Sequence, residues 1–332
     1  MKFEVVSNRY ADINHRCLLH NSNRIVPVAH THPGMKTGGC MDRLQAGVNF
    51  QRSMESMIPF VTGTIKRIYD FPSRFVEART VDIWTPPTYD ESAKIGYPVI
   101  YMHDGQNLFC SETSFIGIDW GIDAAMCRLI SEGTIKAALV VGIWNTPLRM
   151  REYTPQRQLE SQAAGAMMAR CIDEHGGKPL SDNYLNFIID EVKPFVDEHY
   201  HTATDRKHTF IMGSSMGALV SLYALCEYPS VFGGAGCLST HWPAVDTTIL
   251  EYLKEMMPDS AHHRIYFDYG TETLDMMYES FQKQVDTIMQ SAGYGRDETW
   301  ITRKYPGADH SERAWRERVH VPLRFFLSTG LS

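Results

Sequence analysis

Short apolar runs and stretches of helical periodicity follow one another along the chain from about residue 80 onward. Several runs, such as Pro98–Tyr101 and Ala138–Gly142, are apolar at consecutive positions, as in strands that are buried on both faces. Strands and helices that alternate in this way favour a mostly parallel central sheet with helices on both faces. The sequence therefore predicts an α/β fold.

The predicted strands are Thr80–Trp84, Tyr97–His103, Ala137–Ile143, Thr209–Met212, Gly234–Leu238, Arg264–Phe267 and Trp300–Lys304. The predicted helices lie around Gly121–Ile130, Asp182–Glu198, Gly217–Glu227, Thr247–Met256, Met277–Gln290 and Ser311–Leu327. Residues 1–60 have weak periodicity and are predicted to form an irregular extension beside one catalytic domain of residues 61–332. Residues 154–181 are predicted to be a long polar connection, either a flap over an active site or a plain surface excursion.

The composition excludes several classes of protein. With 32 Lys+Arg against 39 Asp+Glu the net charge is −7, so the chain lacks the basic footprint of a nucleic-acid-binding protein. No apolar stretch reaches the ~18 residues of a membrane span. The amino-terminal segment lacks the apolar region of a secretory signal, which predicts a cytoplasmic protein, although a chain whose signal had been removed would look the same. Seven cysteines without paired spacing predict free thiols.

The strongest local motif is Gly213-Ser214-Ser215-Met216-Gly217, which joins a predicted strand directly to a predicted helix. This is the G-x-S-x-G pattern of a nucleophile elbow, a sharp turn that exposes its central serine at the edge of a sheet. Ser215 is therefore the candidate nucleophile, and the Met216 amide is a candidate oxyanion donor. The pattern also occurs by chance in roughly one chain in ten, so an ordinary strand-to-helix turn is the alternative.

A serine nucleophile needs a general base, which usually comes near the carboxyl end of the chain in this class of hydrolase. His310 lies in a glycine-containing loop between the predicted strand Trp300–Lys304 and the last predicted helix. His320 falls inside that helix, and His262 and His263 precede a strand and so fall at the opposite edge of the sheet. His310 is therefore the predicted base, and its alternative role is to cap the last helix.

The triad acid should follow the preceding strand, on the segment from Asp268 to Asp275. Asp275 and Glu272 are both suitable there, and the sequence pattern does not choose between them. The second oxyanion amide should follow the strand that ends at His103, where Gly105 lets the chain turn and presents the amide of Gln106.

Other residues near these motifs have two interpretations each. Asn107 is a predicted substrate contact or a residue that holds its loop together. Trp242, the predicted aromatic substrate contact, and likewise Phe109, Trp120 and Trp144, are able to stack on a sugar or phenolic ring, or to pack in the core. The pairs His30-x-His32 and His199-x-His201 lack further ligands at zinc-like spacing, and no nucleotide-binding glycine motif occurs, so no metal or cofactor is predicted.

These motifs together resemble the Putative esterase family of α/β hydrolases, which includes the esterase D, feruloyl, acetylxylan and enterobactin esterases. The resemblance extends from about Gly63 to Leu327 and includes Tyr101–Phe109, Gly142–Arg149, Gly213–Gly217, Tyr228–Gly234 and Ala308–Trp315. It implies an α/β-hydrolase fold with Ser215 as nucleophile, His310 as base, and the Met216 and Gln106 amides as oxyanion donors.

The chain departs from the family pattern at two positions. It has Ala218 where relatives often have a second glycine, and Thr273 where esterase D relatives have the triad acid. The acid must then have moved to Asp275 or Glu272, and the resemblance favours Asp275.

The resemblance implies a serine carboxylesterase that works through a Ser-His-acid triad and an acyl-enzyme. The expected substrate is a small-molecule or polysaccharide-linked ester, such as an acetyl or phenolic ester, and a siderophore ester fits equally. Acyl transfer to a sugar hydroxyl, or carbohydrate binding without catalysis, are the alternatives. The sequence leaves the oligomeric state open.

Overall fold

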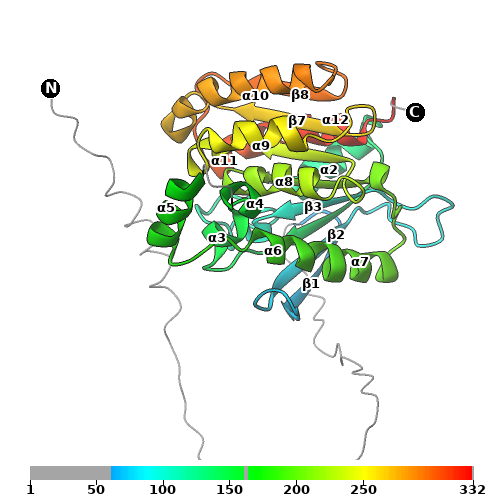
Figure 1. Ribbon diagram of the computed structural model, residues 1–332. Coiled ribbons are helices and arrows are strands. Elements are labelled where there is room, and N and C mark those ends of the chain that lie inside the picture. The colour runs from blue at the N-terminus through cyan, green and yellow to red at the C-terminus, as the bar shows by residue number, and fades with distance from the viewer. Residues whose placement is uncertain (1–60, 161–163, 331–332) are drawn as a thin grey trace, which may run out of the picture. The chain divides into compact units, whose positions relative to one another are not determined.

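The computed structural model describes residues 61–160 and 164–330, and the predicted extension of residues 1–60 lies outside the described residues. Within them, eight strands form one sheet in the order β1-β2-β4-β3-β5-β6-β7-β8 (Figure 1). In chain order the strands are β1 (Thr64–Phe71), β2 (Arg79–Thr85), β3 (Val99–His103), β4 (Leu139–Ile143), β5 (Thr209–Ser214), β6 (Gly234–Leu238), β7 (Arg264–Tyr269) and β8 (Trp300–Lys304).

Strand β2 pairs antiparallel with both β1 and β4, and every other neighbouring pair is parallel. This arrangement confirms the predicted mostly parallel sheet and is that of an α/β-hydrolase fold. Because parallel strands end at the same edge, the loops after β3, β5, β6, β7 and β8 lie along one side of the molecule. Ligand sites of open α/β sheets form at this edge.

The helices of the described residues are α2 (Ile122–Ser131), α3 (Arg149–Tyr153), α4 (Gln156–Leu159), α5 (Gly165–His175), α6 (Ser181–Phe187), α7 (Lys193–His199), α8 (Met216–Glu227), α9 (Thr248–Met256), α10 (Glu279–Ser291), α11 (Glu312–Arg318) and α12 (His320–Leu327). Short 3₁₀ turns include η1 (Gly105–Asn107), η5 (Trp242–Ala244) and η6 (Thr273–Met277). None of the helices in the described ranges is long and apolar enough to cross a membrane.

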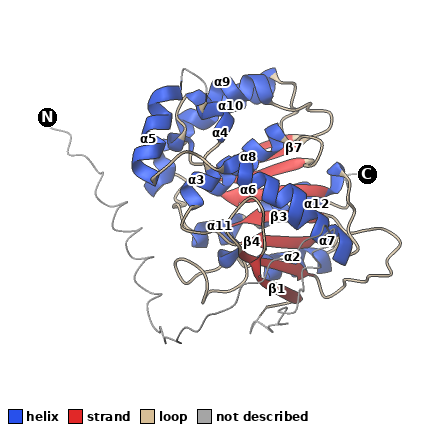
Figure 2. Cartoon of the chain, turned by 60° about the horizontal axis from the view of Figure 1, so that its bottom comes forward, coloured by secondary structure: helices blue, strands red, loops and turns tan. Residues whose placement is uncertain are grey.

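Two apolar layers enclose the sheet, and Figure 2 shows the strands lying between helices. One layer joins the sheet to α6, α7, α8, α9 and α10, and the other joins it to α2, α11 and α12. The central strands β3, β4, β5 and β6 are buried at every position. Continuous apolar runs are required there because both faces of these strands contact helices.

The structure corrects the prediction for residues 154–181. This segment contains α4 and α5 where the sequence analysis expected a loop. Only Cys171 is buried in α5. The predicted helix Asp182–Glu198 is confirmed, although it includes a π-helical turn at Ile188–Val192. That turn precedes Pro194, which has no amide proton to continue regular helical bonding.

Candidate active site

The Gly213–Gly217 motif forms a tight turn between β5 and α8, as the sequence predicts. Ser215 has φ 58° and ψ −120°, a conformation that a non-glycine residue rarely adopts. A Cβ on Gly213 would lie 2.8 Å from the carbonyl carbon of Gly217, so only glycine fits at position 213. Met216 is the first residue of α8, and the first amides of a helix have no partner inside it. The turn therefore combines a half-buried serine with an amide available to an anion.

The turn is fastened to the loop that follows β6. The amide of Ser215 donates to the carbonyl of Leu238 at 2.9 Å, and the carbonyl of Ser215 accepts from the amide of His241 at 3.2 Å. Nδ1 of His241 is 2.7 Å from the hydroxyl of Tyr278. The Tyr278 ring lies edge-on to both His241 and His310, with centroids 5.9 Å apart in each pair. This series of contacts connects the serine turn to His310.

His310 is paired with Asp275. Its Nδ1 lies 2.6 Å from Oδ1 of Asp275, and its amide donates to the hydroxyl of Thr273 at 2.9 Å. Since Nδ1 is engaged by the carboxylate, Nε2 is the nitrogen left to exchange a proton with another group. Among the described residues, no hydrogen bond joins His310 to the hydroxyl of Ser215, a bond that in hydrolases often tightens only in the substrate complex.

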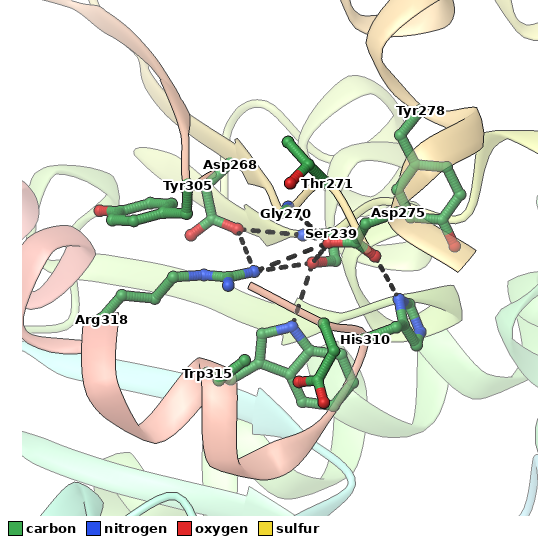
Figure 3. A network of polar contacts seen from close by, with 12 residues as sticks. Ser239, Asp268, Gly270, Thr271, Asp275, Tyr278, Tyr305, His310, Trp315 and Arg318 are labelled. Carbon is green, nitrogen blue, oxygen red and sulfur yellow. Dashed lines mark hydrogen bonds and ion pairs between the residues drawn. The ribbon is translucent and has the colours of Figure 1, made fainter. Parts of the chain in front are cut away.

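Asp275 is buried, and both of its oxygens are occupied (Figure 3). Its Oδ2 accepts from the amide of Gly270 and from the hydroxyl of Ser239, each at 2.6 Å. Burial alone would raise the pKa of Asp275, but the hydrogen bonds from His310, Ser239 and Gly270 outweigh it and leave the pKa below its usual value. The carboxylate is therefore ionised at neutral pH.

The other carboxylates considered for the triad lie elsewhere. Glu272 is exposed and precedes η6, so its side chain faces solvent. Asp268 lies within β7 and is buried against Arg318, with 3.0 Å between Oδ1 and Nη2. The structure thus brings His310 together with Asp275 and not with Glu272.

The loop after β3 is held by ionic and glycine contacts. Asp104 has φ 56°, and its two carboxylate oxygens accept from Nε and Nη2 of Arg149 at 2.7 and 2.8 Å. The Arg149 charge lowers the pKa of Asp104 despite its burial, which alone would raise it. A Cβ on Gly105 would lie 2.5 Å from the carbonyl carbon of Gly142, so glycine is required for the loop to pack on β4.

Gln106 follows directly, in the first turn of η1. Its side-chain oxygen accepts from the amide of Asn145 at 3.2 Å, and its carbonyl accepts from the hydroxyl of Thr113 at 2.6 Å. These contacts fix the residue whose amide the sequence analysis assigns to the oxyanion.

Two predicted substrate contacts have structural roles in the fold. Oδ1 of Asn107 accepts from the amide of Phe115 at 3.0 Å, and Asn107 is buried, so its side chain holds its own loop. Trp242 is 1% exposed and packs against Phe267 in the core. Pro243 follows it in η5. Both side chains thus have partners within the fold, and their contact with a substrate stays a prediction.

Sequence reasoning missed His241, which lies beside the serine turn. The signal was available, because His241 follows a predicted strand at the same edge of the sheet. Burial, with contributions from His310 and Arg149, lowers the pKa of His241 to about 3, so the ring is neutral at neutral pH.

The structure describes one of the two histidine pairs, His199 and His201. No group of three or more His, Cys, Asp or Glu residues in the part of the chain that the structure describes is placed to hold a metal ion. His199 stacks on Phe195 and contacts its carbonyl through Nδ1. His30 and His32 lie outside the described residues.

The sheet order, the serine turn at its carboxyl edge and the His310–Asp275 pair are typical of esterases of the α/β-hydrolase class. The model of the Putative esterase family matches residues 73–326, and the chain belongs to this family. The protein is accordingly a carboxylic ester hydrolase.

The curated relatives include two proteins of Bacillus subtilis. The chain is 21% identical over 249 residues to the uncharacterized protein YbbA, across 73% of this chain and 90% of YbbA. It is 29% identical over 177 residues to the ferri-bacillibactin esterase BesA, across 50% of this chain and 56% of BesA. Among solved structures, a ferulic acid esterase from Anaeromyces mucronatus matches with a TM-score of 0.55 and 22% identity, across 82% and 94% of the two chains. At that identity the structural likeness concerns the fold.

Proposed function

We propose that the protein is a serine carboxylesterase in which Ser215, His310 and Asp275 form the catalytic triad. The observation that carries the proposal is the 2.6 Å contact between Nδ1 of His310 and the buried, ionised carboxylate of Asp275. An engaged Nδ1 leaves Nε2 as the base, and the negative carboxylate stabilises the imidazolium that forms when His310 accepts a proton.

In the proposed reaction, Ser215 transfers its hydroxyl proton to Nε2 of His310 as Oγ attacks the ester carbonyl. The tetrahedral intermediate collapses when the imidazolium returns the proton to the leaving alcohol, which produces an acyl-enzyme. Water then attacks the acyl carbon, again with His310 as base, and the acid product leaves. The amides of Gln106 and Met216 are the proposed donors to the oxyanion in both steps.

The proposed substrate class is argued from the names of the relatives. BesA is named for a siderophore ester and the Anaeromyces protein for a ferulic ester. We therefore propose a small-molecule or polysaccharide-linked ester, with phenolic, acetyl and siderophore esters as the classes to compare.

Hydrolysis of p-nitrophenyl acetate by purified wild type, Ser215→Ala and Ser214→Ala tests the nucleophile. Ser214 is a matched control because it is the neighbouring hydroxyl, buried at the end of β5. We expect turnover to disappear in Ser215→Ala and to persist in Ser214→Ala. Equal rates in wild type and Ser215→Ala would remove Ser215 from the mechanism.

A panel of acetylated, feruloylated and siderophore esters then selects the substrate class. Product analysis with a competing sugar alcohol separates hydrolysis from acyl transfer. Sugar binding without turnover of any ester would instead indicate a binding protein.

A further inference from the structure

The hydroxyl of Ser239 lies at the centre of a buried polar network behind the triad acid (Figure 3). Ser239 follows β6 directly and has φ 46°, and its side chain points toward Asp275 of η6 and toward α11. Its Oγ contacts Oδ2 of Asp275 at 2.6 Å, Nη2 of Arg318 at 2.8 Å and Nε1 of Trp315 at 3.1 Å. Side chains of two elements, η6 and α11, thus meet at one oxygen atom after β6.

The chemistry of these groups fixes the direction of each hydrogen bond. A guanidinium and an indole N–H can only donate, so Arg318 and Trp315 occupy the two acceptor positions of the Ser239 hydroxyl. The single hydroxyl proton must then point to Asp275. Together with the Gly270 amide, it commits Oδ2 of Asp275 to two donors and leaves Oδ1 for His310.

Arg318 also neutralises the charge of a second buried carboxylate, that of Asp268. Its Nη2 donates to Oδ1 of Asp268 at 3.0 Å, and its guanidinium lies over the Tyr305 ring at 5.0 Å. Asp268 and Arg318 therefore form a pair without net charge, 3.9 Å from Asp275 at the nearest nitrogen. The charge of Asp275 is left to interact with His310.

We propose that Ser239 and Arg318 are positioning residues that hold Asp275 as an ionised acceptor aimed at Nδ1 of His310. The inference rests on the proposed triad, because it concerns how the acid of that triad is oriented. Neither residue touches the reacting atoms, and both act through Asp275.

Other titratable groups lie around His310 and Asp275. The Tyr278 ring lies edge-on to His310, and His241 interacts electrostatically with both His310 and Asp275. Tyr305 contacts the Arg318 guanidinium, Arg149 interacts electrostatically with His241 and Glu312, and Asp309 directly precedes His310. His241 is uncharged at neutral pH, and Arg149 is neutralised by Asp104. Arg318 is the cation that an ion pair joins to Asp275.

The proposal predicts opposite shifts of the pH–rate profile when Arg318 and Asp268 are replaced. Replacing Arg318 by glutamine removes a cation near the imidazole, so the imidazolium forms more readily and the acidic limb of the pH–rate profile moves upward by about one pH unit. Asp268→Asn leaves the Arg318 charge uncompensated, which disfavours the imidazolium and moves the same limb downward. Arg318→Lys, which keeps the charge, should stay nearer to wild type than Arg318→Gln.

The hydroxyl is tested by Ser239→Ala and Ser239→Gly. Glycine suits the positive φ at this position, so the Gly variant removes the hydroxyl without a conformational penalty and controls for misfolding. Both variants withdraw a donor from Asp275 and should move the acidic limb upward, with a fall in kcat and little change in KM.

The first measurement is kcat/KM against pH for the five variants and wild type. The second uses Ser215→Ala as background and follows the Nδ1 proton and ring resonances of His310 by NMR against pH, with His310→Asn to assign them. This readout needs no turnover, so it separates failure of this inference from failure of the proposed esterase mechanism.

The proposal is supported if the acidic limb of the pH–rate profile moves upward in Arg318→Gln and in both Ser239 variants, and downward in Asp268→Asn. Loss of activity at every pH with an unchanged midpoint in both measurements would show a purely structural role and overturn it.

Discussion

Arg149 donates to both carboxylate oxygens of Asp104, at 2.7 and 2.8 Å, and so ties α3 to the loop that carries Gln106. Lysine cannot reproduce this forked contact, because its ammonium is a point charge. We predict that Arg149→Lys and Arg149→Met lower kcat at least tenfold through displacement of the Gln106 amide. Steady-state kinetics test this prediction, and Asp104→Asn completes a double-mutant cycle. Additive losses in the cycle would contradict a shared role.

Asp275 and Glu272 give a direct comparison of two neighbouring acids. Asp275→Asn keeps the shape but removes the charge that stabilises the imidazolium, and we expect kcat to fall by roughly 10²–10⁴. Glu272→Gln changes an exposed side chain and should alter kcat less than twofold. A larger loss in the Glu272 variant would assign the acid to that residue.

The backbone conformation at Ser215 predicts that replacing this serine by glycine stabilises the protein. At φ 58° and ψ −120°, a side chain is strained by roughly 1–3 kcal/mol, and glycine relieves that strain. Ser215→Gly should therefore unfold at higher urea than Ser215→Ala, although both lack the hydroxyl. Equal midpoints would mean that the turn stores no strain at this residue.

His103 predicts a dependence of stability on pH. The ring is buried, its Nδ1 lies 2.7 Å from the Tyr184 hydroxyl, and burial lowers its pKa to about 3. The unfolded chain binds a proton at about pH 6.5, so the folding free energy that His103 contributes is complete above that pH and is lost as the pH falls toward 3.

The loss amounts to about 2 kcal/mol at pH 5. The free energy of unfolding, measured with urea, should be higher at pH 7 than at pH 5 in the wild type. In His103→Gln, whose side chain does not titrate, this difference should be smaller by the same amount. His241, with a similarly low pKa, is expected to add a contribution of the same sign. An unchanged difference in His103→Gln would contradict the prediction.

The sequence predicted the parts of the fold that local pattern determines. The strands β3, β4, β5 and β6 are buried throughout and mostly apolar, and the glycines at 213 and 217 match the turn around Ser215. Strand β1 was missed because it is an edge strand with a mixed buried and exposed pattern and several charged residues.

Contacts between distant segments were beyond the reach of sequence reasoning. Ser239, Asp268 and Arg318 come from three elements, and their pairing depends on how α11 packs at the end of the sheet. The choice between Asp275 and Glu272 depends on the geometry of η6, which turns one carboxylate inward and leaves the other in solvent. The same residues at the same spacing would be compatible with either carboxylate pointing inward.

The segment that contains α4 and α5 contacts the residues after His241 and does so independently of the proposed triad. Arg170 of α5 donates to the carbonyls of Pro243 and Ala244, just past His241, while Gln158 of α4 donates to Thr248. None of these contacts involves the residues of the proposed triad. Substitutions in α5 can therefore alter the segment after β6 during evolution, while the sheet that carries the proposed triad stays intact.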